Sequence, residues 1–266
     1  MIKKTIIAFV SFLLATNLHS QLGIDIGYNY NLSVFQRLGS SNSYGIDSVN
    51  GYYENTNSRH MYKPNLLIGA SYIYNSLILT LEYSKISVST NTSYIEGNFI
   101  KDYYDDRTYL NLLNLTFGFK KIILRNIVFH GYIGASTSLE APVTIRNNNI
   151  YFKFQEPVLD RYKFHSGSLF GYSSGARIEY QFFKKLRIGI NIGIGALRWK
   201  PKKMDLQSHI VNGVEKIQDY PPSLKYYHLR DQCRSDEGKP DMGCLPAKLF
   251  NYSFLSTMIY IRYNFW

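Results

Sequence analysis

The sequence predicts an all-β protein, an eight-stranded antiparallel transmembrane up-and-down β-barrel with long extracellular loops and short periplasmic turns. Three observations predict this fold: apolar and polar residues alternate over eight segments, the connections alternate between long and short, and aromatic residues are abundant. The alternation is clearest over 186–197, where Leu186 and four isoleucines fall on one parity and Arg187, Asn191 and three glycines on the other. An extended chain places these two sets on opposite faces. We interpret this segment as a strand with one face toward lipid.

Seven further segments show the same pattern. In one of them, 77–89, the phase slips near Lys85, after which Ile86 and Val88 take over the outward parity, so we expect a β-bulge there. At about 3.3 Å per residue and a tilt of about 45°, each segment is long enough to cross an apolar band of about 25 Å. The expected ranges are 22–35, 65–74, 77–89, 107–119, 127–139, 168–182 and 250–266.

The connections between these segments alternate in length. Outer-membrane barrels keep short turns on the periplasmic side and long loops outside, whereas a soluble β-sandwich, the alternative fold, has no reason to sort its loops in this way. In two long loops we expect projecting hairpins, one around the three asparagines after Arg146 and one at Asn212-Gly213. The long connections cover 37–62, 90–106, 140–165 and 199–249, and the short ones cover 75–76, 120–126 and 183–185.

The N-terminus has the plan of a secretory signal peptide. Lys3 and Lys4 precede an apolar run over 5–15, and the small residue Ser20 stands before Gln21. The alternative, a helical membrane anchor, needs roughly 20 apolar residues, which is more than this run supplies. We expect residues 1–20 to be removed and residues 21–266 to form one barrel domain in the outer membrane, because no shift in composition marks a second domain.

Composition and charge indicate the partners. The chain has 24 Tyr and 16 Phe, charged residues make up 18%, and the formal net charge is +11. The aromatic residues suit the interfacial rings of a barrel. The basic balance favours outer-membrane lipid, lipopolysaccharide and other acidic polysaccharide as partners, and nucleic acid is not an expected partner outside the cell. No pattern indicates a cofactor.

Two cysteines, Cys233 and Cys244, lie in one polar stretch of the last long loop. In an exported protein nearby thiols commonly pair, and closing this short loop contributes about 2–3 kcal/mol to its order. A metal site is the alternative, but it lacks a nearby pair of histidines. We predict a disulfide.

The inward parity of the predicted strands carries three acids and three arginines among other polar residues. An eight-stranded barrel is too narrow for an open pore, so we expect these groups to neutralise one another across the interior as a structural polar plug. The alternative, a path for protons or small ions, requires a continuous file of water. The predicted network contains Asp25, Glu82, Asn114, His130, Arg177, Glu179, Arg187, Asn191, Tyr260 and Arg262.

A hydrolytic site needs a nucleophile and a base held together. The candidates are His165 with Ser166 or Ser168, and Ser208 with His209. Adjacent residues on a strand point to opposite faces, so His165 and Ser166 are not expected to be partners, and the loop residues Ser208 and His209 have no fixed geometry. We therefore predict that the protein is not an enzyme.

The long loops are the more promising functional region. Tyr226 and Tyr227 lie deep in the longest loop, among mixed charges. Paired tyrosines form contact surfaces against proteins or glycans, whereas aromatic residues close to the strands are expected to form the interfacial belt. We predict that Tyr226 and Tyr227 contact an extracellular protein or glycan.

In these features the chain resembles the small eight-stranded outer-membrane β-barrel proteins of the OmpX and OmpA type and the PorT-like barrels of Bacteroidota. The resemblance runs from Gln21 to the ending Tyr263-Asn264-Phe265-Trp266, which is similar to the terminal recognition signal for barrel insertion. It implies a non-enzymatic protein that acts through its extracellular loops in surface binding or envelope integrity. The similarity to PorT-like barrels implies the alternative, an accessory component that works with the subunits of a protein secretion system. A lipid-modifying enzyme is the more remote alternative.

Overall fold

The computed structural model describes residues 20–33, 59–96, 100–152, 157–221, 225–230, 244–246 and 249–265. Residues 1–19 of the predicted signal peptide 1–20, most of the first long loop, Cys233 and Trp266 lie outside the described residues. Within them the only helical element is the short 3-10 helix η1 (Ile217–Asp219). The described chain contains no helix that is both long and apolar enough to cross a membrane.

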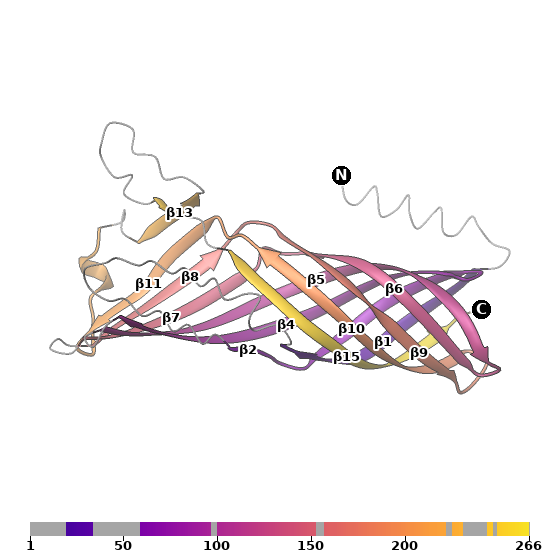
Figure 1. Ribbon diagram of the computed structural model, residues 1–266. Helices are drawn as coiled ribbons and strands as arrows, with labels where there is room; N and C mark the ends of the chain where they lie inside the picture. Colours follow the sequence, from indigo (N-terminus) through magenta and orange to yellow (C-terminus); the bar gives the residue numbers. More distant parts are fainter. Residues whose placement is uncertain are drawn as a thin grey trace, which may run out of the picture.

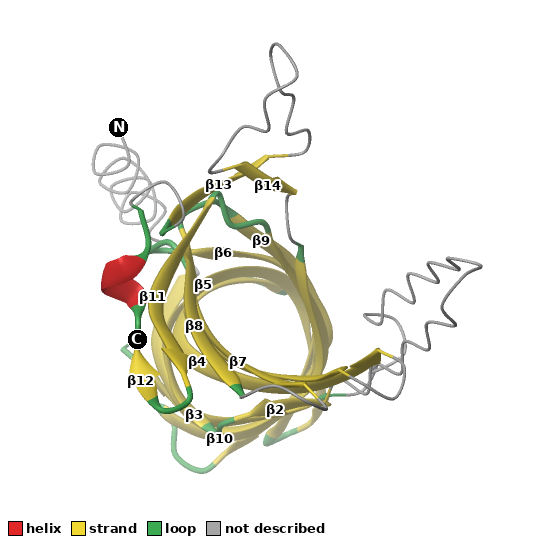
Figure 2. Cartoon of the chain, turned by 90° about the vertical axis from the view of Figure 1, so that its left-hand side faces the viewer, coloured by secondary structure: helices red, strands yellow, loops and turns green. Residues whose placement is uncertain are grey.

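Eight strands pair side by side and close into a ring, which Figure 2 shows from one end. Every pair in the ring is antiparallel, and β15 pairs with β1 to close it. The all-β antiparallel prediction is thereby confirmed. The ring strands, in spatial order, are β1 (Ser20–Leu32), β3 (Asn65–Tyr74), β4 (Leu77–Glu96), β5 (Ile100–Leu124), β6 (Ile127–Ser138), β9 (Leu169–Gln181), β10 (Leu186–Trp199) and β15 (Phe250–Asn264).

The short connections of the ring gather at one end. Residues 75–76, 125–126 and 182–185 join neighbouring ring strands there, and the first residues of β1 and the last residues of β15 lie at the same end. Asn75 adopts a left-handed backbone conformation (φ 52°), as a two-residue hairpin turn requires. The connections predicted over 37–62, 140–165 and 199–249 leave from the opposite end (Figure 1), which agrees with the predicted sorting by length. The long loop predicted over 90–106 is wrong, because β4 and β5 stay paired through it, from Thr90 with Asp106 to Glu96 with Ile100.

At that opposite end the sheet of the ring continues into a smaller extension, which we call the outer sheet. Its anchor is β5, whose later residues pair with β6 in the ring while its earlier residues, from Tyr109 back to Ile100, pair with β7. Further strands continue from β7, and a short strand pairs with β4 (Figure 1). The additional strands are β2 (Arg59–Tyr62), β7 (Val143–Phe152), β8 (Val158–His165), β11 (Lys203–Val211), β12 (Val214–Glu215), β13 (Tyr226–Arg230) and β14 (Cys244–Pro246).

Two further local predictions are wrong. There is no bulge at Lys85, because β4 pairs with β5 in one unbroken register, and Ile86 and Val88 point into the interior, where they are 4% and 0% exposed. The asparagines after Arg146 form no turn either, since they continue β7 between β5 and β8. The Asn212-Gly213 hairpin is confirmed: Val211 pairs with Val214, and both turn residues have positive φ.

Candidate functional site in the interior of the ring

The interior nearest the short turns is a layer of buried ion pairs centred on Arg262. Its Nε and Nη2 donate to the two carboxylate oxygens of Asp25 over 2.6 and 2.7 Å, and its Nη1 lies 2.6 Å from Oε1 of Glu179. All three side chains are 0% exposed. Because a lone buried charge is strongly unfavourable, each of these groups depends on the others to remain in the interior.

Glu179 gathers further partners from three other strands. The Tyr260 hydroxyl donates to its Oε1 over 2.7 Å, Arg187 Nη1 donates to its Oε2 over 3.3 Å, and His130 Nε2 lies 3.1 Å from Oε2. These contacts cross the interior between β6, β9, β10 and β15. Together with the Arg262–Glu179 contact, they connect four more of the ten predicted network residues to the Asp25–Arg262 ion pair.

A second ion pair lies next to this layer. Arg177 on β9 pairs with Glu82 on β4, and its guanidinium lies 4.8 Å from the centre of the Tyr132 ring. Asn114 donates to the other Glu82 oxygen over 3.2 Å and accepts from Ser136 and Ser173. The structure thus joins nine of the predicted network residues by contacts, and it places the tenth, Asn191, on the wall of the cavity described next.

The positions of the inward glycines explain how the large side chains fit inside the ring. Inward glycines stand opposite the large rings: a Cβ placed on Gly189 would lie 2.5 Å from Cζ of Tyr260, its cross-strand partner. A Cβ on Gly195 would lie 2.6 Å from Cζ of Phe254. On β10 the isoleucines point outward and the glycines point inward. The inward face of this strand therefore leaves room for the rings of Tyr260 and Phe254.

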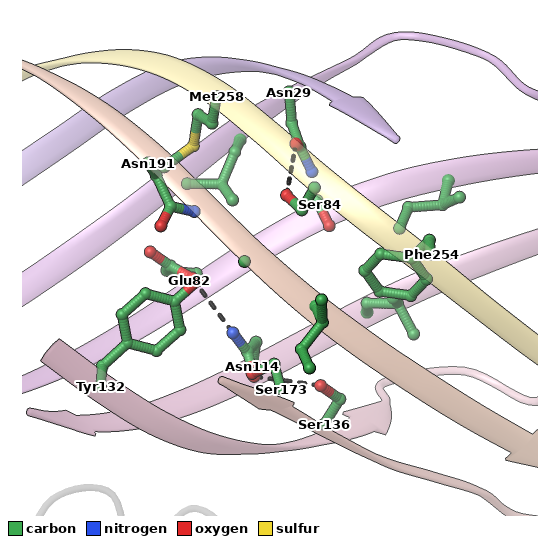
Figure 3. A pocket seen from close by; sticks show the side chains of 16 residues that line it. Asn29, Glu82, Ser84, Asn114, Tyr132, Ser136, Ser173, Asn191, Phe254 and Met258 are labelled. Carbon is green, nitrogen blue, oxygen red and sulfur yellow. Dashed lines mark hydrogen bonds between the residues drawn. The ribbon is translucent and has the colours of Figure 1, made fainter. Parts of the chain in front are cut away.

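A cavity of about 60 Å³ lies beyond the ion pairs (Figure 3). Carboxamide, hydroxyl and carboxylate groups line much of its wall, with Asn29, Ser84, Asn114 and Asn191 among them. A volume of this size holds a few water molecules, because one water needs roughly 10–15 Å³ by this measure. Leu67, Phe254 and Met258 are among its apolar lining residues, so the cavity is a small chamber of mixed polarity in the middle of the ring.

An apolar cluster fills the interior beyond the cavity, at the end that carries the outer sheet. Trp199 is fully buried and stacks on Phe250 with ring centroids 5.1 Å apart. The predicted polar plug did not include this cluster. Its signal in the sequence was the inward parity of leucines and aromatic residues near the outer ends of β5, β10 and β15. The buried members are Tyr62, Ile86, Val88, Leu110, Leu112, Phe164, Leu169, Leu197, Trp199, Met204, Leu229, Phe250 and Tyr252.

The outer sheet holds two histidine–carboxylate pairs between β8 and β11. His165 Nε2 lies 2.8 Å from Asp205 Oδ2, and Ser166 Oγ lies 3.2 Å from His165 Nδ1. His209 Nδ1 lies 2.6 Å from Asp160 Oδ1. The expectation that His165 and Ser166 are not partners is wrong, because Ser166 leaves the strand with a left-handed backbone (φ 63°) that turns its hydroxyl toward His165.

Ser208 and His209 also have a defined geometry, contrary to expectation. Ser208 donates to Glu215 rather than to the imidazole of His209. Glu215 also accepts from the backbone N–H groups of His209 and Ile217, over 2.9 and 3.1 Å. These hydrogen bonds, the one from Ser208 first, lower the pKa of the exposed Glu215 carboxyl. The pair is therefore part of the β11–β12 hairpin and not a nucleophile with its base.

Two remaining predictions concern the loop residues. Tyr226 is 62% exposed on β13, whereas Tyr227 packs against the apolar cluster, so the two rings face opposite sides of the outer sheet. Burial raises the pKa of the Tyr227 hydroxyl. The predicted disulfide involves Cys233, which lies outside the described residues, and Cys244, whose backbone alone is described as part of β14.

The chain is similar in structure to a major outer membrane protein from Thermus thermophilus. The TM-score is 0.43 and the sequence identity 10%, and the match covers 93% of this chain and 100% of that chain. No family model matches the sequence, and no curated protein matches it.

Proposed function

We propose that the chain is an outer-membrane β-barrel protein of eight strands that passes no solute and acts through its outer sheet, in contacts with an extracellular partner or in support of the envelope. The proposal rests on two features observed together. The outward face of the ring is apolar, and the interior of the ring is closed in two places.

The outward face of the ring supports membrane insertion. Large apolar side chains are at least half exposed on strands all around it, including Ile26 (54%), Phe117 (52%), Ile190 (55%) and Ile259 (64%). A soluble protein rarely exposes a contiguous apolar band of this extent, because water makes it costly. Lipid removes that cost, and a closed ring satisfies the backbone hydrogen bonds that an open sheet would leave unpaired at its edges.

The interior supports a closed barrel. The layer around Arg262 fills the end near the short turns, and the cluster around Trp199 fills the other end, so the cavity between them is short. An ion that crossed would have to displace paired charges and then pass fully buried apolar side chains. Each step is costly in a medium of low dielectric constant.

The outer sheet supports a role in surface contacts. It continues β4 and β5 beyond the ring as strands of 20 and 25 residues, and Tyr226 stands exposed on it. An ordered sheet that projects from a membrane protein presents rigid contact groups to a partner at low entropic cost.

Electrical recording tests the proposal. The full chain, folded in detergent and shown to migrate in a heat-dependent manner on SDS gels, is inserted into planar lipid bilayers. We expect insertion without steady conductance. Stable open channels in the wild-type protein would contradict the closed interior, and recovery of the exported chain in the aqueous fraction without detergent would contradict the membrane barrel.

A further inference from the structure

The contact between Ser166 and His165 has the connectivity of a serine hydrolase site. The Asp205 carboxylate only accepts hydrogen bonds, so His165 Nε2 carries the hydrogen of their 2.8 Å contact. In the neutral imidazole Nδ1 then carries no hydrogen, and it accepts from the Ser166 hydroxyl over 3.2 Å. The chain of contacts runs hydroxyl, imidazole, carboxylate, which is the arrangement that makes a serine nucleophilic.

The backbone at Ser166 is strained and firmly held. Ser166 has φ 63°, a conformation that costs a non-glycine residue energy and is concentrated at functional sites. The indole Nε1 of the fully buried Trp199 donates to the Ser166 carbonyl oxygen over 3.1 Å. A Cβ at Gly167 would overlap the Lys200 carbonyl oxygen, so the next residue must be glycine for the turn to form. The turn is therefore fixed from both sides, and the hydroxyl has a set direction.

The three side chains lie on the open face of the outer sheet. Phe164 and Met204 point into the apolar cluster, so their neighbours His165 and Asp205 point the other way. The side chains of His165 and Asp205 are 26% and 27% exposed, which leaves the imidazole accessible to a substrate. In contrast, the buried His130 in the ring interior has no such access, being 2% exposed.

The location indicates the substrate class. Ser166 lies three residues before the start of β9, whose outward residues Phe170 and Tyr172 are 66% and 63% exposed. If the ring spans the membrane as proposed above, these two aromatic side chains lie in the lipid interface, and Ser166, at the outer end of the ring, lies close to the ester groups of the outer leaflet. The substrate class inferred here rests on that proposed function, whereas the geometry of the three side chains does not.

We propose that Ser166, His165 and Asp205 form a site that hydrolyses acyl esters of lipids at the outer surface. Ser166 Oγ bonds to the acyl carbonyl carbon while its proton passes to His165 Nδ1. The bond from that carbon to the alcohol oxygen then breaks, and the alcohol leaves with the proton from Nδ1. Water repeats the sequence on the acyl serine, which releases a carboxylic acid and restores Ser166. Asp205 is a positioning residue that keeps the hydrogen on Nε2.

The test is covalent labelling of the full chain in detergent with a fluorophosphonate, followed by peptide mass spectrometry. We expect an adduct on Ser166, loss of that adduct in Ser166→Ala, and at least a roughly 100-fold lower labelling rate in His165→Asn. Asp205→Asn keeps a hydrogen bond but donates to Nε2 and moves the ring hydrogen to Nδ1, so we expect a similar loss and a changed pH profile of labelling. Ser168→Ala is the matched control, because Ser168 is exposed in the same turn, and it should label as the wild type does.

Two outcomes would overturn the site: no adduct on Ser166 in the folded wild-type chain, or labelling of Ser166 at an unchanged rate in both His165→Asn and Asp205→Asn. The substrate class is tested with vesicles of diacyl phospholipid beside a soluble short-chain ester. Release of fatty acid from the vesicles supports a lipid substrate, and cleavage of the soluble ester alone overturns it. Because labelling is done in detergent, its failure is independent of whether the ring spans a membrane, and open channels in the bilayer recording would leave a labelled Ser166 in place.

Discussion

A single inward residue, Arg262, compensates the charge of two carboxylates that are buried in the interior of the ring. It contacts both Asp25 and Glu179, and all three side chains are fully buried. Two carboxylates without their shared arginine would be left in a medium that does not solvate them. The ion-pair layer is therefore a set of mutually dependent residues.

Replacing this arginine should be strongly destabilising. We expect Arg262→Leu to lower the free energy of unfolding by about 4 kcal/mol, since removal of one partner leaves buried charge uncompensated. The measurement is a urea titration of the protein folded in lipid vesicles, followed by tryptophan fluorescence. Arg198→Leu is the matched control, because Arg198 is exposed near the outer end of β10. Equal midpoints for the two variants would contradict the buried network.

Glycine at position 189 is required for a similar local reason. We expect Gly189→Ala to cost about 2 kcal/mol, because the new Cβ would overlap the Tyr260 ring and force that side chain away from Glu179. The same substitution at Gly131 is the control, since its Cβ would meet only one ring atom, 4.0 Å away. The comparison uses the same urea titration. If Gly189→Ala and Gly131→Ala had equal free energies of unfolding, Tyr260 would not be packed over β10.

At the scale of the element, β4 shows what alternation alone misjudges. The sequence places apolar residues on both parities around Lys85, which suggested a slip in phase. The strand instead keeps one register, and its inward side changes from polar, at Glu82 and Ser84, to apolar, at Ile86 and Val88. The change in polarity marks the boundary between the cavity and the apolar cluster.

The unbroken register of β4 predicts that substitutions at Lys85 and at Ile86 change the free energy of unfolding by different amounts. We expect Ile86→Asn to lower the free energy of unfolding by about 3 kcal/mol, because it removes buried hydrocarbon and puts an amide into the apolar cluster. Lys85→Asn introduces the same residue on the exposed side and should change the free energy of unfolding little. A bulge at Lys85 would instead make Ile86→Asn the milder change, and the two denaturation midpoints would then be reversed.

The sequence predicted the ring strands better than the outer sheet, for a physical reason. Over the part that surrounds the ion pairs and the cavity, ring strands have an apolar outward face and a polar inward face, so a period of two is imposed there, and 65–74 agrees with β3 at both ends. β7 has no such constraint, and its asparagines, which usually favour turns, are kept extended by pairing with β5 and β8.

The candidate sites also differ in how well the sequence predicted them. Parity alone was enough to collect the charged residues of the interior, because every inward residue of a closed ring faces the others. Their pairing was not predictable, since it depends on the stagger between strands. Ser166 was misjudged because the strand rule was applied one residue past the end of β8, where a positive φ reverses the direction of the side chain.

At the scale of the whole molecule, the chain combines three interior layers inside one apolar wall. Ion pairs, a small cavity of mixed polarity and an apolar cluster follow one another from the short turns to the outer sheet. All of them depend on the ring being closed, because an open sheet would expose the ion pairs to water and leave the edges of β1 and β15 unpaired. Closure between these two strands is thus the central structural claim.

A cross-link between β1 and β15 in isolated outer membranes tests that claim most directly. Tyr28 and Ile259 are cross-strand partners on the outward face, so Tyr28→Cys and Ile259→Cys bring two thiols within disulfide reach once Cys233 and Cys244 are replaced by serine. Oxidation should join these two thiols in the membrane fraction and shift migration on non-reducing gels. The control pair, Tyr28→Cys with Ile190→Cys, is one strand further apart and should not join. The absence of the first cross-link, equal formation of both, or a protein found outside the membrane fraction would contradict a closed ring in the outer membrane.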